Sequence, residues 1–129
     1  MFGFGKKKKP LKKEATQQIT RKEEHELEVH VDDLKNKIKK TEDGKKYLLY
    51  EELGNAYIKL NQKDAAIAAF EASLENNEHF GTTYNSLLNL YEIKRKEAAK
   101  NGKDVEIQKW VTKTEELLKM SKHIMRSKF

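Results

Sequence analysis

The sequence predicts an all-α protein in which antiparallel helical hairpins stack side by side. Three observations support this fold class. Aliphatic, aromatic and small residues recur at helical spacing from Tyr47 to Tyr91. The stretch YEELGNAYIKLNQKDAAIAAFEASLENNEHF is followed by a partial second copy, TTYNSLLNLY. Charged residues make up 37% of the chain, hydrophobic ones 36%, and there is one proline, a balance that suits long solvated helices better than a sandwich or a barrel.

The length and the residue types exclude several classes of protein. A chain of 129 residues forms one domain with a modest core. The absence of cysteine excludes a disulfide framework and a cysteine-based metal site, and it fits a reducing cytosol. No apolar run reaches the ~18 residues that span a bilayer. The basic N-terminus has no apolar segment after it, so it is not a secretory signal. We therefore expect a cytoplasmic protein.

Residues 1–19 are expected to form a flexible basic arm, because glycines and the one proline oppose regular structure there. Residues 1–13 contain six lysines and no acid, and the 21 basic residues that remain equal the 21 acidic ones, so the arm carries the whole net charge of +6. These lysines are Lys6, Lys7, Lys8, Lys9, Lys12 and Lys13. A solvated tail is the simplest interpretation. The alternatives are an anionic membrane surface, with Phe2 and Phe4 as an aromatic tip, or nucleic acid.

The first helix is expected over residues 20–40. Thr20 and Glu23 have the spacing of a capping box, in which each side chain accepts a hydrogen bond from a backbone amide. One apolar stripe follows at spacings of four, three and four: Leu27, Val31, Leu34 and Ile38. A stripe this narrow needs a partner, which is either the following helices or a second copy of the chain.

Two helices joined by a tight turn are expected next, over about residues 45–60 and 63–75. Gly54 lies in the middle of the first of them, where glycine usually allows another helix to approach closely. Asn61 can take the left-handed conformation that ends a helix. The second helix has a face of small residues, which sets a close distance between the two axes. These residues are Ala65, Ala66, Ala69, Ala72 and Ser73.

This hairpin resembles a tetratricopeptide repeat, the 34-residue helix–turn–helix unit. The matching residues are Tyr50, Leu53, Gly54, Tyr57, Ala66 and Phe70. Ser73 replaces the usual alanine, Glu78 replaces the usual proline, and Asn61 lies where glycine is common. The resemblance implies a first repeat over residues 44–77, within a helical domain that spans residues 20–129.

A second, extended repeat is expected over residues 81–128. Tyr84, Leu87 and Tyr91 occupy the family positions 34 residues later, and Leu88 replaces glycine. The helix then overruns until Asn101-Gly102, and Asp104 is expected to cap a long last helix. Its inward residues are predicted to be Val105, Ile107, Trp110, Val111, Thr114, Leu117, Leu118, Ile124 and Met125. The first and last helices then act as caps on a short solenoid of about five helices; in the alternative, two chains complete each other as a homodimer.

The resemblance also implies a binding groove, because the first helix of each repeat in the family lines a concave surface that takes a peptide or a helix. The corresponding residues are Leu48, Glu51, Asn55, Ile58, Lys59, Thr82, Asn85, Asn89 and Glu92. Asn55 and Asn89 lie at matching places in the two repeats and can bond both backbone groups of a peptide. As ordinary solvated residues they would have no such role. Lysine and arginine are missing from the positions that clamp a C-terminal carboxylate, so we expect a neutral or basic ligand.

No pattern in the sequence indicates catalysis or a cofactor. The four histidines are scattered, and His25 and His30 are five residues apart, which places them on different helix faces and argues against a metal site. Adjacent acidic pairs splay apart on a helix, and no phosphate loop, nucleophile motif or dinucleotide fingerprint occurs. The sequence thus predicts a non-catalytic adaptor that binds a protein or peptide partner. The alternative is an accessory module that acts through the arm at the inner face of a membrane or on nucleic acid.

Overall fold

The computed structural model describes residues 19–77 and 81–128, and these residues form helices connected by short turns, with no strand among them. The predicted all-helical fold is therefore confirmed. The helices are α2 (Arg21–Lys40), the short 3-10 helix η1 (Asp43–Lys45), α3 (Tyr47–Lys59), α4 (Lys63–Asn76), α5 (Thr82–Lys100) and α6 (Asp104–Lys128).

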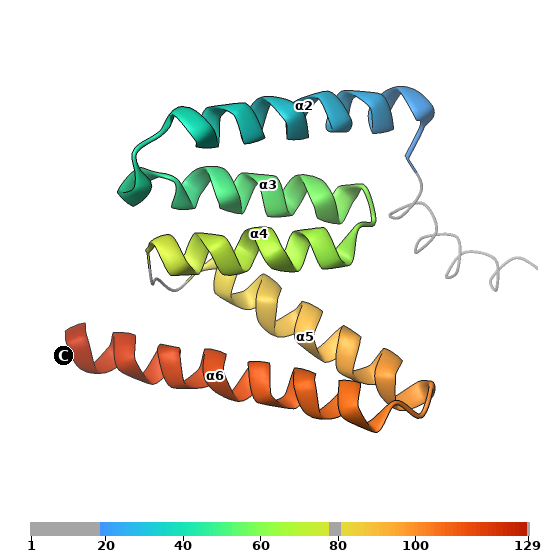
Figure 1. Ribbon diagram of the computed structural model, residues 1–129, viewed down its shortest axis with the longest axis vertical. Coiled ribbons are helices and arrows are strands. Elements are labelled where there is room, and N and C mark those ends of the chain that lie inside the picture. Colours follow the sequence, from blue (N-terminus) through green and yellow to red (C-terminus); the bar gives the residue numbers. More distant parts are fainter. Residues whose placement is uncertain (1–18, 78–80, 129) are drawn as a thin grey trace, which may run out of the picture.

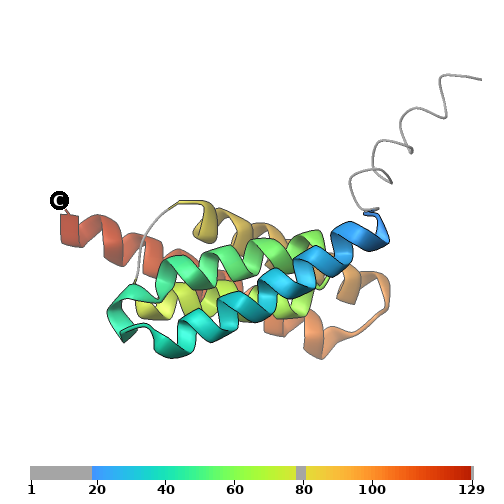
Figure 2. The same cartoon turned by 90° about the horizontal axis from the view of Figure 1, so that it is seen from above.

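The five α-helices of the described residues form a single stack in chain order (Figure 1). Each helix packs mainly on its neighbours in the sequence, with α3 against α4 and α5 against α6 as the two tightest pairs. Helix α5 runs obliquely to α4, and α6 returns along α5 (Figure 1). The last turns of α6 project past the ends of the other helices (Figure 2). Helices α2 and α6 thus form the two ends of the stack.

Helix α2 begins and packs as its sequence predicts. The Glu23 amide donates to Thr20 Oγ1 and the Thr20 amide donates to Glu23 Oε1, both at 3.0 Å, so the capping box is confirmed. Val31, Leu34 and Ile38 are buried in a cluster with residues of α3 and α4. The stripe of α2 therefore finds its partner within the same chain.

The hairpin of α3 and α4 is held together by the contact between Gly54 and Phe70. A Cβ atom built on Gly54 would lie 2.5 Å from Cε1 of Phe70, whose side chain is fully buried. The predicted close approach of another helix at Gly54 is confirmed, because the Phe70 ring of α4 occupies the space that a side chain at this position would need. Asn61 has a φ of 60°, which is the left-handed conformation expected at the end of the helix. Ser73 is fully buried and donates to the Tyr47 carbonyl at 2.8 Å, so its hydroxyl fastens α4 to the start of α3.

A second core cluster joins the two hairpins. It contains Ala66, Ile67, Phe70, Leu74, Tyr84, Leu87, Leu90, Tyr91, Trp110 and Leu117. The ring centroids of Tyr91 and Trp110 are 5.7 Å apart, and Trp110 is 5% exposed. Trp110 is thus confirmed as a core anchor.

Three residues predicted to face inward from α6 are exposed instead: Val105 at 82%, Leu118 at 44% and Met125 at 47%. The buried line of α6 runs through Trp110, Leu117 and Ile124 at seven-residue spacing. Leu118 and Met125 each follow a member of this line by one residue, which turns them by about 100° around the helix axis. Val105 lies in the first turn, beyond the reach of the core. These three predictions were wrong because apolar character alone does not fix which side of a wide stripe is covered.

A small polar cluster connects α4, α5 and α6 next to this core. The Tyr91 hydroxyl donates to Glu71 Oε2 at 2.5 Å, and the Lys113 ammonium donates to the same oxygen at 2.9 Å. Lys113 Nζ also lies 5.9 Å from the centre of the Tyr91 ring. Burial, and then the bond to the Glu71 carboxylate, raises the pKa of Tyr91 far above its ordinary value of 10.0.

The raised pKa of Tyr91 predicts a loss of stability in alkaline solution. The unfolded chain releases this proton above pH ~10, whereas the folded chain holds it to a higher pH, so the stabilisation is complete below pH ~10 and declines above it. We expect Tyr91→Phe, which cannot ionise, to make the free energy of unfolding decline less steeply with pH in that range. Urea titrations at a series of pH values measure the slope. An equal slope for the variant and the wild type contradicts the assignment.

Candidate functional site

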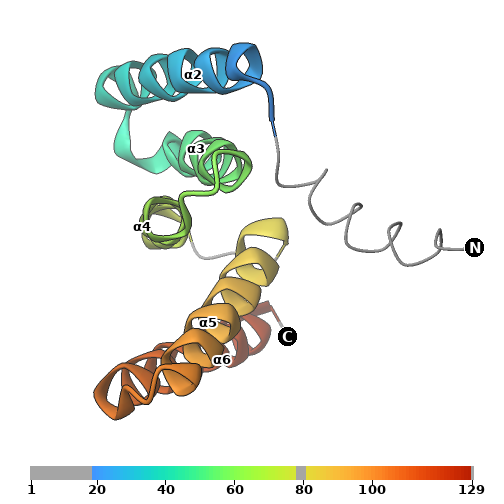
Figure 3. The ribbon, with the colours of Figure 1, turned by 90° about the vertical axis from the view of Figure 1, so that its right-hand side faces the viewer.

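The nine residues predicted to line a groove lie on α3 and α5. Eight of them are exposed and Glu51 is partly exposed. The two helices meet where the Thr82 hydroxyl donates to Glu51 Oε2, a bond between the middle of α3 and the first residue of α5. Viewed along the axes of α3 and α4, α3 and the first turns of α5 lie on the same side of α4 (Figure 3). We call these nine residues the α3/α5 face.

Helix α3 contributes apolar surface to this face. Leu48 is 58% exposed and Ile58 is 42% exposed, and both are among the few large hydrophobic side chains that the described residues leave in water. They are ten residues apart, which is ~15 Å along a helix, with Asn55 between them. Because this strip is apolar at both ends and polar in the middle, it can bury part of a ligand and also accept hydrogen bonds from it.

Three asparagines supply the polar part of the α3/α5 face. Asn55, Asn85 and Asn89 are exposed, and their side-chain amides bond to no other described residue. Each amide offers a donor and an acceptor, which is the pair that an extended peptide backbone presents. Asn55 and Asn89 are 34 residues apart, so each hairpin places one amide at its outer surface.

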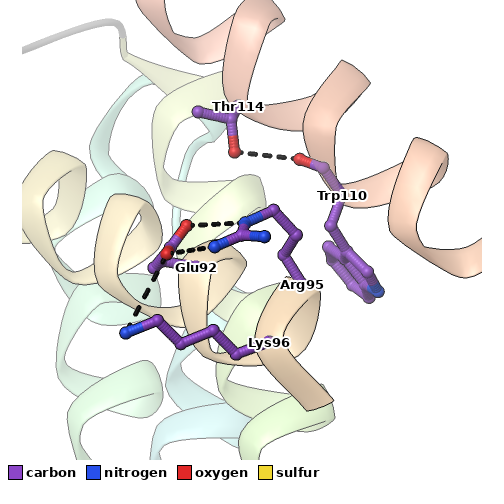
Figure 4. Close-up of polar contacts among 5 residues, drawn as sticks. All are labelled: Glu92, Arg95, Lys96, Trp110 and Thr114. Atoms are coloured by element: carbon purple, nitrogen blue, oxygen red, sulfur yellow. Dashed lines mark hydrogen bonds and ion pairs between the residues drawn. The ribbon is translucent and has the colours of Figure 1, made fainter. Parts of the chain in front are cut away.

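The two carboxylates of the face are already engaged within the protein. Glu51 accepts the bond from Thr82. The Arg95 guanidinium donates two hydrogen bonds to Glu92, from Nε to Oε1 at 3.0 Å and from Nη2 to Oε2 at 2.6 Å (Figure 4). Lys96 Nζ lies 4.0 Å from Glu92 Oε2. The bond from Arg95 lowers the pKa of Glu92 below its usual value. Arg95 therefore compensates the charge of Glu92, whereas Glu51 keeps its charge and accepts a bond from a neutral hydroxyl. The polar groups of the face that bond to no other described residue include the asparagine amides and Lys59.

A second hollow, of about 340 Å³, lies at the junction of α4, α5 and α6. Its lining includes Trp110 and Lys113 of α6 and Lys94 of α5, and sequence reasoning did not bring the two helices together at this point. Lys94 pairs with Asp64 at 3.0 Å and Lys113 with Glu71 at 2.9 Å. Since the charges compensate one another and Trp110 is buried, these contacts hold the helices together and leave little free charge for an anion.

Several further predictions have no counterpart on the α3/α5 face. The basic arm, with Lys6, Lys7, Lys8, Lys9, Lys12 and Lys13, lies outside the described residues, as does His79. In the described part of the chain, His, Asp and Glu side chains do not gather in groups of three that could hold a metal ion. The helices of that part are all too short or too polar to cross a bilayer.

Comparison with known proteins identifies no relative, since no family model, no curated protein and no solved structure matches the chain. The site is therefore argued from its own geometry. Sequence reasoning named the asparagines as candidates and missed the bonds that engage Glu51 and Glu92. For Glu92 a signal was present, because Arg95 and Lys96 follow it at helical spacings of three and four. For Glu51 none was present, because Thr82 is 31 residues away.

Proposed function

We propose that this protein is a non-catalytic interaction module that binds an extended peptide segment of a partner protein on the α3/α5 face. The proposal rests on the exposed amides of Asn55 and Asn89, which bond to no other described residue and lie at matching places on two stacked hairpins. Exposed Leu48 and Ile58 flank Asn55 on α3. This arrangement is similar to that of tetratricopeptide repeats, which supports the same interpretation.

The charges of the α3/α5 face favour a neutral peptide over an acidic or strongly basic one. Thr82 and Arg95 engage the two carboxylates of the face. Lys59, at the end of α3, makes no ion pair with the described residues. Affinity is then expected from main-chain hydrogen bonds to the asparagines, and selectivity from apolar side chains placed on Leu48 and Ile58.

The test is peptide selection followed by substitution. Peptides are selected from a random library displayed on phage, with the full chain as bait, and their dissociation constants are measured by fluorescence polarisation. We expect Asn55→Ala and Asn89→Ala each to weaken binding by about tenfold, because each removes a pair of hydrogen bonds worth roughly 0.5–1.5 kcal/mol apiece. Leu48→Ala is expected to weaken it as well.

The matched control is Asn36→Ala, which removes an exposed asparagine from α2. Its affinity should equal that of the wild type. If both asparagine variants of the α3/α5 face bind as tightly as the Asn36 control, the peptides bind elsewhere and the assignment is wrong. Deleting residues 1–13 as well shows whether the lysine-rich arm adds an electrostatic contribution, which salt would weaken.

A further inference from the structure

The two ends of the helical stack differ in chemical character. On α2, the exposed side chains are charged or polar except for Val29. On α6, Leu118 and Met125 are 44% and 47% exposed. Stacked helical hairpins need a polar outer surface on their terminal units, because each unit otherwise offers an apolar side to the next one. The α2 end of the stack therefore has a polar outer surface, whereas the α6 end leaves two large apolar side chains exposed.

Apart from Val105, the exposed apolar residues of α6 belong to a regular seam. Six partly or well exposed positions follow one another at alternating spacings of four and three residues, which is the heptad repeat of a helix that packs on another helix. We call them the α6 seam: Ile107, Val111, Thr114, Leu118, Ser121 and Met125. From Ile107 to Met125 the seam is ~27 Å long.

The two polar residues of the seam, Thr114 and Ser121, are small enough to be buried against a second helix. The Thr114 hydroxyl donates to the Trp110 carbonyl at 2.9 Å, so its polar group is already satisfied within α6 (Figure 4). Thr114 and Ser121 alternate with Val111, Leu118 and Met125, of which the last two are larger. Large and small residues in alternation allow two helices to approach closely and interlock.

We propose that the α6 seam is a dimer interface, on which a second copy of this chain lays its own α6 in antiparallel orientation. The argument for this occupant is charge complementarity. Glu115 and Lys122 lie beside the seam on the same flank, and neither makes an ion pair with the described residues. In an antiparallel pair centred next to Leu118, Glu115 of each copy lies opposite Lys122 of the other. Two-fold symmetry makes this contact twice.

The C-terminal part of the seam, with Ser121 and Met125, lies on the projecting end of α6. The last turns of α6 extend beyond the rest of the stack (Figure 2), and α2 lies at the opposite end (Figure 3). No residue of the α6 seam belongs to the α3/α5 face, so the dimer proposal does not rest on the proposed peptide site and has its own test.

Sedimentation equilibrium of the full chain tests the dimer. We expect the wild type to reach twice the chain mass of 15.1 kDa as its concentration rises. Leu118→Asp should remain monomeric over the same range, because it places a carboxylate next to its own symmetry copy. Val105→Asp is the control, since Val105 is 82% exposed outside the seam, and it should dimerise like the wild type. Circular dichroism confirms that both variants are folded.

A charge exchange distinguishes the antiparallel pairing from any other contact. Glu115→Lys places two lysines opposite each other at both symmetric sites and should raise the dissociation constant of the dimer by about tenfold or more. Adding Lys122→Glu restores opposite charges and should return the constant to near the wild-type value. A wild type that stays monomeric at every concentration, a dimer that survives Leu118→Asp, or a double variant as weak as Glu115→Lys overturns the proposal.

Discussion

Phe70→Ala is expected to lower the free energy of unfolding by about 4 kcal/mol, because it empties a fully enclosed site. The Phe70 side chain is 0% exposed and belongs to the cluster that joins α4 to α5 and α6, and its ring also contacts Gly54 of α3. A domain of this size has a total stability of about 5–15 kcal/mol. The loss is therefore a large part of the whole. Urea denaturation followed by circular dichroism measures it.

Leu48→Ala provides the comparison for Phe70→Ala. Leu48 is 58% exposed on α3, so its truncation should change stability by less than about 0.5 kcal/mol. If the two substitutions cost similar amounts, Phe70 does not hold the two hairpins together as described. Since Leu48 belongs to the α3/α5 face, the same variant also separates binding from stability: it should fold normally and bind selected peptides weakly.

The helical hairpins could be predicted because each rests on local physics. Thr20 and Glu23 are three residues apart and satisfy each other's amides wherever the helix lies. Asn61 ends α3 through its own backbone conformation. Gly54 is unfavourable within a helix, so its presence indicated a close neighbour before the neighbour was known. In each of these cases the residue type itself indicates the local structure that it produces.

The parts that could not be predicted depend on long-range placement. Leu117 and Leu118 are the same residue type at adjacent positions, and only the direction of α5 decides that the first is buried and the second exposed. The bond from Thr82 to Glu51 depends on how one hairpin sits on the other, and so does the cluster of Tyr91, Glu71 and Lys113. The nine residues of the α3/α5 face were predicted from the resemblance, but their electrostatic character was not.

Ser73 shows how a departure from a sequence pattern can have a structural reason. The hairpin pattern favours alanine at this position, and the serine there is fully buried, where a lone hydroxyl is unfavourable. The Tyr47 carbonyl at the start of α3 accepts a hydrogen bond from this hydroxyl, with the two oxygens 2.8 Å apart. The serine that replaces alanine thus adds a hydrogen bond between the two helices of the first hairpin.

Gly54→Val is expected to lower the free energy of unfolding by about 3 kcal/mol, and Gly54→Ala by about 1 kcal/mol, both through overpacking. The second value is the sharper test, because two effects oppose each other. Helix propensity alone predicts that alanine stabilises α3 by ~1 kcal/mol. The contact predicts the opposite sign, since the new Cβ would lie 2.5–2.7 Å from three carbons of the Phe70 ring, which is buried and has no free space to move into.

The control for Gly54→Val is Ala68→Val, at an exposed position of α4. It measures the cost of a β-branched residue in a helix without a collision, which is expected to be about 0.5 kcal/mol. Combining Gly54→Ala with Phe70→Leu adds a second check, because the smaller side chain gives the new methyl group room and the two losses should sum to more than the double variant shows. Strictly additive losses, or a Gly54→Ala variant more stable than the wild type, would mean that α3 and α4 have room to separate. In that case the close packing of the first hairpin, which sets the position of Asn55 relative to Asn89, is not as described.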